Sequence, residues 1–130
     1  MKAGLDVGLQ QEVTVTVTSE MRPQFDGVVV HDVYSTAAMV HQMEHAARKI
    51  LLPYLEEHEE GMGVSVTVHH LAPAPVGAVV RAVATVEEFS PRKIVTAVEV
   101  YSGDVKIGKG LVVQAVLPKE KIRERIADSN

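Results

Sequence analysis

The hydrophobic positions follow a helical period in one long stretch and an alternating period elsewhere. Between residues 32 and 52, apolar residues recur at spacings of three and four, which places them on one stripe of an α-helix. The stripe comprises Val33, Ala37, Val40, Ala47 and Leu51. Asp32 is a suitable N-cap, and Pro53 should stop the helix because the residue before a proline avoids the helical region.

Five other segments alternate between apolar and polar residues or are rich in β-branched residues, as strands are. We expect strands at 12–18, 64–71, 77–89, 92–101 and 105–117. On the last strand the expected inner face comprises Val105, Ile107, Leu111, Val113, Ala115 and Leu117. The segment 19–30 has no clear period and is interpreted as a loop, whereas 119–128 is a short charged helix or a frayed tail.

The element order is a strand, a long helix and four further strands. This order predicts an α+β fold in which the helix covers one face of an antiparallel sheet. The last four strands can pair as a meander through short turns such as Ser102-Gly103-Asp104. A chain of 130 residues without a long linker indicates one domain, residues 1–130.

Composition narrows the function classes. The hydrophobic fraction of 46% is typical of a packed core, and the absence of cysteine excludes disulfides, thiolate metal sites and a cysteine nucleophile. No apolar run reaches the roughly 20 residues that cross a bilayer, and the N-terminus lacks the apolar core of a signal peptide. These features favour a cytoplasmic protein without a membrane partner. A net charge of -4 argues against nucleic acid as a partner.

Two ionisable residues fall in apolar phase. Glu44 lies in the helical stripe, where a carboxylate is unfavourable unless it is paired. His70 continues the valine series of the strand at 64–71, while His69 faces the other way. If both faces point inward, Glu44 and His70 are either a general acid/base pair or a buried structural pair. The spacing alone does not choose between the two.

Thr36 falls in the first helical turn. Unpaired N–H groups there suit a developing oxyanion, and a hydroxyl there can orient water or attack an acyl group. An ordinary first-turn threonine is the alternative. Thr36 and Glu44 lie about 12 Å apart along an ideal helix. They reach one small group only if the helix begins after Thr36 or if two chains share the site.

The remaining motifs are few. The sequence has no GxGxxG, Walker, GxSxG or HExxH motif. The expected solvated face of the helix carries His41, Gln42, His45, Arg48 and Lys49. His41 and His45 are four residues apart but have no obvious third ligand, so we expect no metal site.

Two segments, DVYSTAAMVHQMEHAA and GVSVTVHHLAPAPVG, together with the element order resemble hotdog-fold acyl-CoA thioesterases, in particular the fluoroacetyl-CoA thioesterase group. The resemblance implies a five-stranded antiparallel sheet wrapped on one long central helix. It also implies a homodimer or a dimer of dimers with active sites at the subunit interface. The resemblance implies that Thr36, Glu44 and His70 are the catalytic residues. It also implies that Gly63 contacts the substrate. The substrate is then an acyl-CoA, and no separate cofactor is implied.

The sequence departs from this group at the positions that surround the acyl site. Lid phenylalanines of the group's defining member correspond to Gly27 and Val30 here, and an arginine of the last strand corresponds to Gln114. Val30 and Gln114 are therefore candidate substrate contacts without the features tied to fluorine recognition. Arg92 and Lys93, in a hairpin, either contact the phosphates of coenzyme A or form an ordinary basic turn.

The sequence therefore predicts a thioesterase that hydrolyses a short or small acyl-CoA. Two other functions fit the same fold, because a fold does not determine function. One is a non-catalytic module that binds acyl-CoA or a small ligand. The other is a hotdog enoyl-CoA hydratase or dehydratase. Thioester turnover and enoyl-CoA hydration separate these alternatives.

Overall fold

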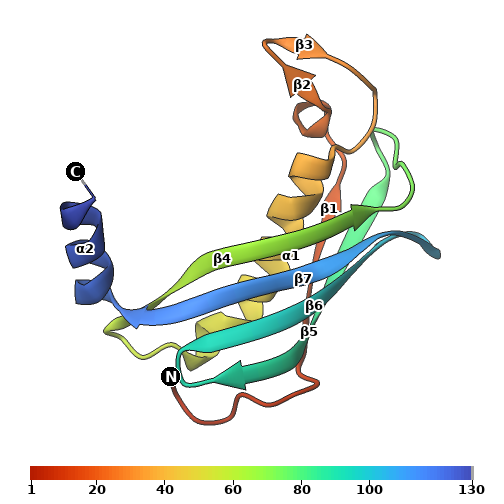
Figure 1. Ribbon diagram of the computed structural model, residues 1–130. Coiled ribbons are helices and arrows are strands. Elements are labelled where there is room, and N and C mark those ends of the chain that lie inside the picture. The colour runs from red at the N-terminus through yellow and green to blue at the C-terminus, as the bar shows by residue number, and fades with distance from the viewer. Residues whose placement is uncertain (130) are drawn as a thin grey trace.

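The computed structural model describes residues 1–129, so the last residue of the expected domain, residue 130, lies outside the described part. One long helix, α1 (Thr36–Leu51), packs against one face of a curved five-stranded antiparallel sheet (Figure 1). The strands of this sheet are β1 (Gln10–Thr16), β4 (Glu59–His70), β5 (Val79–Ser90), β6 (Lys93–Ser102) and β7 (Val105–Pro118). The expected α+β arrangement is confirmed.

The sheet order is β1-β5-β6-β7-β4. The meander expected for the last four strands is therefore wrong for β4, which pairs with β7 rather than with its chain neighbour β5. Residues 71–78 carry the chain across the end of the sheet from one edge region to the other (Figure 1). With β1 and β4 as its two edges, the sheet curls around α1 from both sides. Alternation along a strand reports which face is buried but not which neighbour it pairs with.

The start of α1 is set by Ser35. Its backbone is extended and its Oγ accepts a hydrogen bond from the Ala38 N–H at 3.0 Å, as an N-cap does. The prediction that Asp32 caps the helix is wrong, because Asp32 binds Arg22 instead, at 3.0 Å between Oδ1 and Nη1. Thr36 is consequently the first helical residue.

The buried face of α1 differs in phase from the predicted stripe. It comprises Met39, Gln42, Met43, Ala46, Ala47, Ile50 and Leu51. Ala37 and Glu44 are exposed, so their assignment to the inner stripe is wrong, as is that of Gln42 to the solvated face. Alanines occur on both sides of this helix, and the bulky methionines and isoleucine decide which side packs.

Gln42 is buried because its amide is fully used. Its Nε2 donates to the carbonyls of Val13 and Val80 at 2.9 Å each, and its Oε1 accepts from the Tyr34 hydroxyl. A buried amide without such partners would be strongly unfavourable. Gln42 thus ties α1 to β1 and β5 through their backbones.

The inner face of β7 agrees with the prediction at Ile107, which is buried, but is shifted by one residue beyond Gly110. Val112, Gln114 and Val116 are buried, whereas Leu111 is exposed and the intervening residues are half-buried. Both faces of this strand carry valines, so alternation was ambiguous. The register depends on close contacts that only tertiary structure shows: a Cβ added at Gly110 would lie 1.8 Å from the Thr67 carbonyl oxygen.

The segment interpreted as a loop holds short elements. They are η1 (Ser19–Met21), β2 (Gln24–Phe25) and β3 (Val28–Val29). Asp26 and Gly27 both have positive φ, 53° and 77°, as a two-residue type I′ hairpin turn requires. This β2–β3 hairpin stands beyond the N-terminal end of α1 (Figure 1).

The N-terminal residues lie near the C-terminal end of α1, where the Lys2 N–H donates to the Tyr54 carbonyl (Figure 1). Helix η2 (Leu52–Tyr54) carries Pro53 and follows α1 directly. Of the two alternatives left open for residues 119–128, the structure has the helix, α2 (Lys119–Asp128), which projects from the end of β7 opposite the β2–β3 hairpin (Figure 1). Across residues 1–129 no helix is long and apolar enough to cross a membrane.

Candidate active site

Thr36 and His70 meet where α1 begins and β4 ends. The Thr36 Oγ1 and the His70 Nδ1 are 2.9 Å apart, within hydrogen-bonding distance. Thr36 is exposed and His70 is half-buried. The Tyr34 ring lies edge-on to the imidazole, with centroids 6.3 Å apart and planes at 75°. The hydrogen bond at Nδ1 and the contact with the Tyr34 ring together fix the orientation of the imidazole.

The second nitrogen of His70 is left free. Its Nε2 is buried and has no hydrogen-bond partner within the described residues. An imidazole fixed through Nδ1 with an available Nε2 can exchange a proton with a bound group. Burial raises the pKa of Tyr34, so its hydroxyl stays neutral and donates to Gln42.

Glu44 belongs to a second cluster of polar residues, further along α1. A Cβ added at Gly63 would lie 3.2 Å from the Glu44 Oε2, so the glycine lets the carboxylate approach the strand closely. Gly63 is the ladder partner of Gln114 on β7. These three residues line one pocket of about 370 Å³, together with His41, His45, Arg48, Gly61 and Val112.

Within one chain, the Thr36–His70 cluster and the Glu44–Gly63 cluster are separate. Glu44 lies against Gly63, seven residues before His70, which is about 23 Å of extended strand. No hydrogen bond or ion pair joins Glu44 to His70 in residues 1–129. The prediction that they form one internal pair is therefore wrong for a single chain. Thr36 takes the place beside His70 instead.

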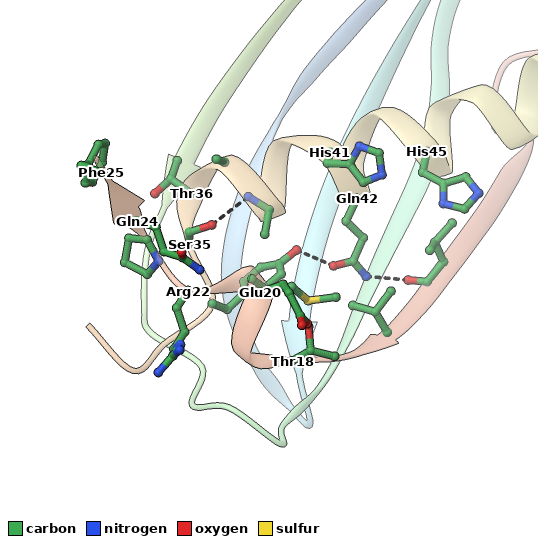
Figure 2. Close-up of a pocket in the computed structure, with 17 residues that line it drawn as sticks. Thr18, Glu20, Arg22, Gln24, Phe25, Ser35, Thr36, His41, Gln42 and His45 are labelled. Carbon is green, nitrogen blue, oxygen red and sulfur yellow. Dashed lines mark hydrogen bonds between the residues drawn. The ribbon is translucent and has the colours of Figure 1, made fainter. Parts of the chain in front are cut away.

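A larger pocket of about 860 Å³ runs along the other side of α1. Figure 2 shows Thr36 and Phe25 at one end, Gln42 in the wall, and His41 and His45 further along the helix. Val13 and Val15 of β1 and residues 18 and 20–25 line much of the rest, and these include the polar side chains of Thr18, Glu20, Arg22 and Gln24. Residues 20–25, which belong to the segment interpreted as a loop, form part of the wall of this pocket. The Asp26-Gly27 pair was the available signal for a hairpin.

Three predicted contacts lie away from both pockets. Val30 is half exposed, and its N–H donates to the Pro23 carbonyl. Arg92 is exposed in the β5–β6 turn, and Lys93 lines a separate depression of about 300 Å³. In the part of the chain that the structure describes, none of the three lines the pocket of Thr36 or that of Glu44.

The polar clusters of the site do not form a metal centre in residues 1–129. His41 and His45 line both pockets, but no group of three His, Asp or Glu side chains there is arranged to hold a metal ion.

A long helix wrapped by a five-stranded antiparallel sheet is the hotdog fold of thioesterase-like proteins, and the Thr36–His70 contact lies at the start of that helix. A solved structure of a Thermus thermophilus hypothetical protein of the thioesterase superfamily superposes with a TM-score of 0.92, at 39% identity over 97% of this chain and 93% of that chain. The fluoroacetyl-CoA thioesterase FlK superposes with a TM-score of 0.90, at 26% identity over 98% of both chains.

The sequence comparisons give the family. The family model described as fluoroacetyl-CoA-specific thioesterase matches residues 17–120. The fluoroacetyl-CoA thioesterase of Streptantibioticus cattleyicolor is 32% identical over 95 residues, which cover 73% of this chain and 68% of that protein. The chain belongs to the fluoroacetyl-CoA-specific thioesterase family and is a thioester hydrolase. The predicted fold and enzyme class are confirmed.

Proposed function

We propose that this chain hydrolyses short acyl-CoA thioesters at active sites that are each assembled from two copies of the chain. The observation that carries the proposal is the 2.9 Å contact between Thr36 and His70, which leaves the buried His70 Nε2 without a partner among the described residues. Membership of a thioesterase family supports the same chemistry. The relative that is a fluoroacetyl-CoA thioesterase supports an acyl-CoA as the thioester substrate.

Exposed apolar residues on β4 and on the β2–β3 hairpin support a second copy of the chain as the part that completes the site. β4 is an edge strand, and Met62 and Val64 on it are exposed, the valine by 63%. Phe25 and Val28 of the β2–β3 hairpin are exposed by 69% and 64%. Exposed apolar residues along an unpaired strand edge are typical of an interface. We therefore propose a homodimer, alone or within a dimer of dimers.

Antiparallel pairing of β4 with β4 of a second copy of the chain would bring the Thr36–His70 cluster of one copy next to the Glu44–Gly63 cluster of the other. If Gly63 lies opposite His70 of the partner subunit, the two-fold axis passes between Val66 and Thr67. The Glu44–Gly63 group of one copy then lies beside His70 of the partner subunit. This arrangement removes the separation of about 12 Å that keeps Thr36 and Glu44 apart along one helix.

The chemistry follows from these positions. Water, or the Thr36 hydroxyl, attacks the thioester carbonyl while His70 accepts its proton. Backbone N–H groups at the start of α1 stabilise the oxyanion, because they carry partial positive charge. Glu44 of the neighbouring copy stabilises the imidazolium. The carbon–sulfur bond then breaks and the departing thiolate takes a proton from His70. If Thr36 attacks, a second cycle with water releases the acid.

The phosphates of coenzyme A need cations near the mouth of the site. Arg92 and Lys93 are exposed and remain our candidates for this contact. Their placement relative to the acyl pocket in the dimer depends on the partner. Loss of either charge is then expected to raise KM and to leave kcat nearly unchanged.

Thr36→Val is expected to lower kcat/KM for a short acyl-CoA by about tenfold or more, while the melting temperature changes little. Valine keeps the shape of threonine but removes the hydroxyl that contacts His70. Thr36 is exposed, and Ser35 rather than Thr36 caps the helix, so folding does not depend on it. Thiol release and thermal unfolding of both proteins measure the effect. Unchanged turnover in the valine variant assigns no chemical role to Thr36.

The proposal as a whole is tested by thiol release from a panel of acyl-CoA thioesters. We expect turnover of ordinary short acyl-CoAs and a ratio of kcat/KM for fluoroacetyl-CoA over acetyl-CoA within about 200-fold, the limit of discrimination by pocket shape. Gly27, Val30 and Gln114 occupy positions where the family resemblance implies aromatic and cationic residues. A ratio of many thousands contradicts this assignment. Absence of turnover with every member of the panel favours a binding module instead.

A further inference from the structure

Gln114 carries a buried polar group that the protein itself does not satisfy. Its side chain is 5% exposed, and its Nε2 has no hydrogen-bond partner within residues 1–129. Native proteins pair nearly all such atoms, since a buried unpaired donor opposes folding. Gln42 shows the contrast, because its equally buried amide makes three hydrogen bonds. An unpaired amide at a pocket wall indicates a partner supplied by a ligand.

The surroundings of Gln114 define what that ligand group must be. Gln114 and Glu44 line the same pocket of about 370 Å³, an amide donor and a carboxylate acceptor. Between them lies Gly63, which has no side chain to fill the space and which pairs with Gln114 in the β4–β7 ladder. A hydroxyl group fits this pair, because it accepts one hydrogen bond and donates another.

Other polar groups fit less well. A carboxylate on the acyl chain would face the Glu44 carboxylate, and like charges in a confined pocket repel. Arg48, the cation that lines the pocket, is held by Glu60 at 3.1 Å. A purely apolar acyl chain leaves the Gln114 amide unpaired. The pocket therefore favours a neutral acyl group that carries a hydroxyl.

We infer that the preferred substrates are short acyl thioesters whose acyl group carries a hydroxyl, recognised by Gln114. The inference rests on the proposed thioesterase function and adds the class of acyl group. The reaction is unchanged, with water cleaving the carbon–sulfur bond.

The test compares two matched substrate pairs: glycolyl-CoA with acetyl-CoA, and 3-hydroxybutyryl-CoA with butyryl-CoA. We expect kcat/KM for the hydroxylated member of at least one pair to be higher by about tenfold or more, because the other member leaves a buried amide unpaired. Gln114→Met keeps the length of the side chain and removes the amide. It is expected to reduce that ratio by about tenfold.

Thr96→Val is the matched control. Thr96 is fully buried on β6 and its Oγ1 also lacks a partner in the described chain, but Thr96 lines neither pocket. We expect this variant to keep the wild-type ratio. We also expect Gln114→Met without substrate to melt at or above the wild-type temperature, since an unpaired buried amide is removed.

The outcomes separate the two levels of the argument. Turnover of acetyl-CoA and butyryl-CoA with ratios near one or below would overturn the inference about Gln114 and leave the thioesterase function in place. An elevated ratio that survives Gln114→Met would assign recognition to another residue. If Gln114→Met does not fold, the wild-type ratios alone decide. Absence of turnover with all four substrates rejects the proposed function and the inference with it.

Discussion

His70→Ala is expected to lower kcat for thioester hydrolysis by about 10²- to 10⁴-fold, the usual contribution of a positioned general acid or base. The imidazole contacts Thr36 at 2.9 Å through Nδ1, and its second nitrogen, the buried Nε2, has no hydrogen-bond partner within the described residues. Thiol release gives the rate and circular dichroism gives the folded fraction. A folded variant with near-native turnover contradicts the role of His70.

Glu44→Gln is expected to lower kcat in the same range. Its effect on folding should be small, because Glu44 is exposed in the single chain. Arg48→Gln, on the same helix face one turn further on, is a useful comparison. Its guanidinium binds Glu60, and our mechanism gives it no part in the chemistry. It is expected to alter stability and substrate affinity more than kcat.

The two variants together test whether each site draws on two chains. In a mixed dimer of one Glu44→Gln chain and one His70→Ala chain, a two-chain site leaves one site with both residues intact. Equal mixing should then restore about a quarter of wild-type activity, because half of the dimers are mixed and each has one intact site. If each site is built within one chain, every site in the mixture lacks a residue and no activity returns.

Gly110→Ala is expected to lower the free energy of unfolding by about 3 kcal/mol or more, a large part of the stability of a typical domain. The added Cβ would lie 1.8 Å from the Thr67 carbonyl oxygen and 2.9 Å from the Met43 Cε. The nearer contact is with backbone, so side-chain rotation does not relieve it. β4 must separate from β7, and His70 at the end of β4 moves with it.

Lys109→Ala is the matched control for this change. Lys109 neighbours Gly110 on β7 and is exposed, so the same residue is introduced without a contact to the core. Urea unfolding of both variants measures the difference, and m-values check that the unfolded states compare. Similar stability of the two variants would mean that the β4–β7 spacing is not as tight here as the structure shows.

The sequence by itself determined the kinds of element and most of their extents. Alternating valines and threonines predicted β1, whereas the charged segment after Pro118 left a helix and a frayed tail equally open. These signals are local, because they depend on side-chain period and on β-branched residues. The resemblance in two short segments was sufficient to indicate the hotdog fold and the thioesterase class.

The same local signals could not decide which residues face inward. Gln42 is polar and was placed outside, yet three hydrogen bonds from β1, β5 and Tyr34 make its burial favourable. Glu44 lies between apolar neighbours and was placed inside, yet it is exposed at a pocket. Hydrogen-bond partners distant in sequence determine both outcomes, and period alone contains no information about them.

Only the tertiary structure decided how the candidate residues are grouped. Thr36, Glu44 and His70 were selected from the sequence as one set, but β4 crosses α1 so that His70 meets Thr36 at one end and Gly63 meets Glu44 further along. The order of strands places β4 at the sheet edge, where it is open to a second copy. Strand order arises from the packing of the whole sheet around α1, which no single segment of the sequence specifies.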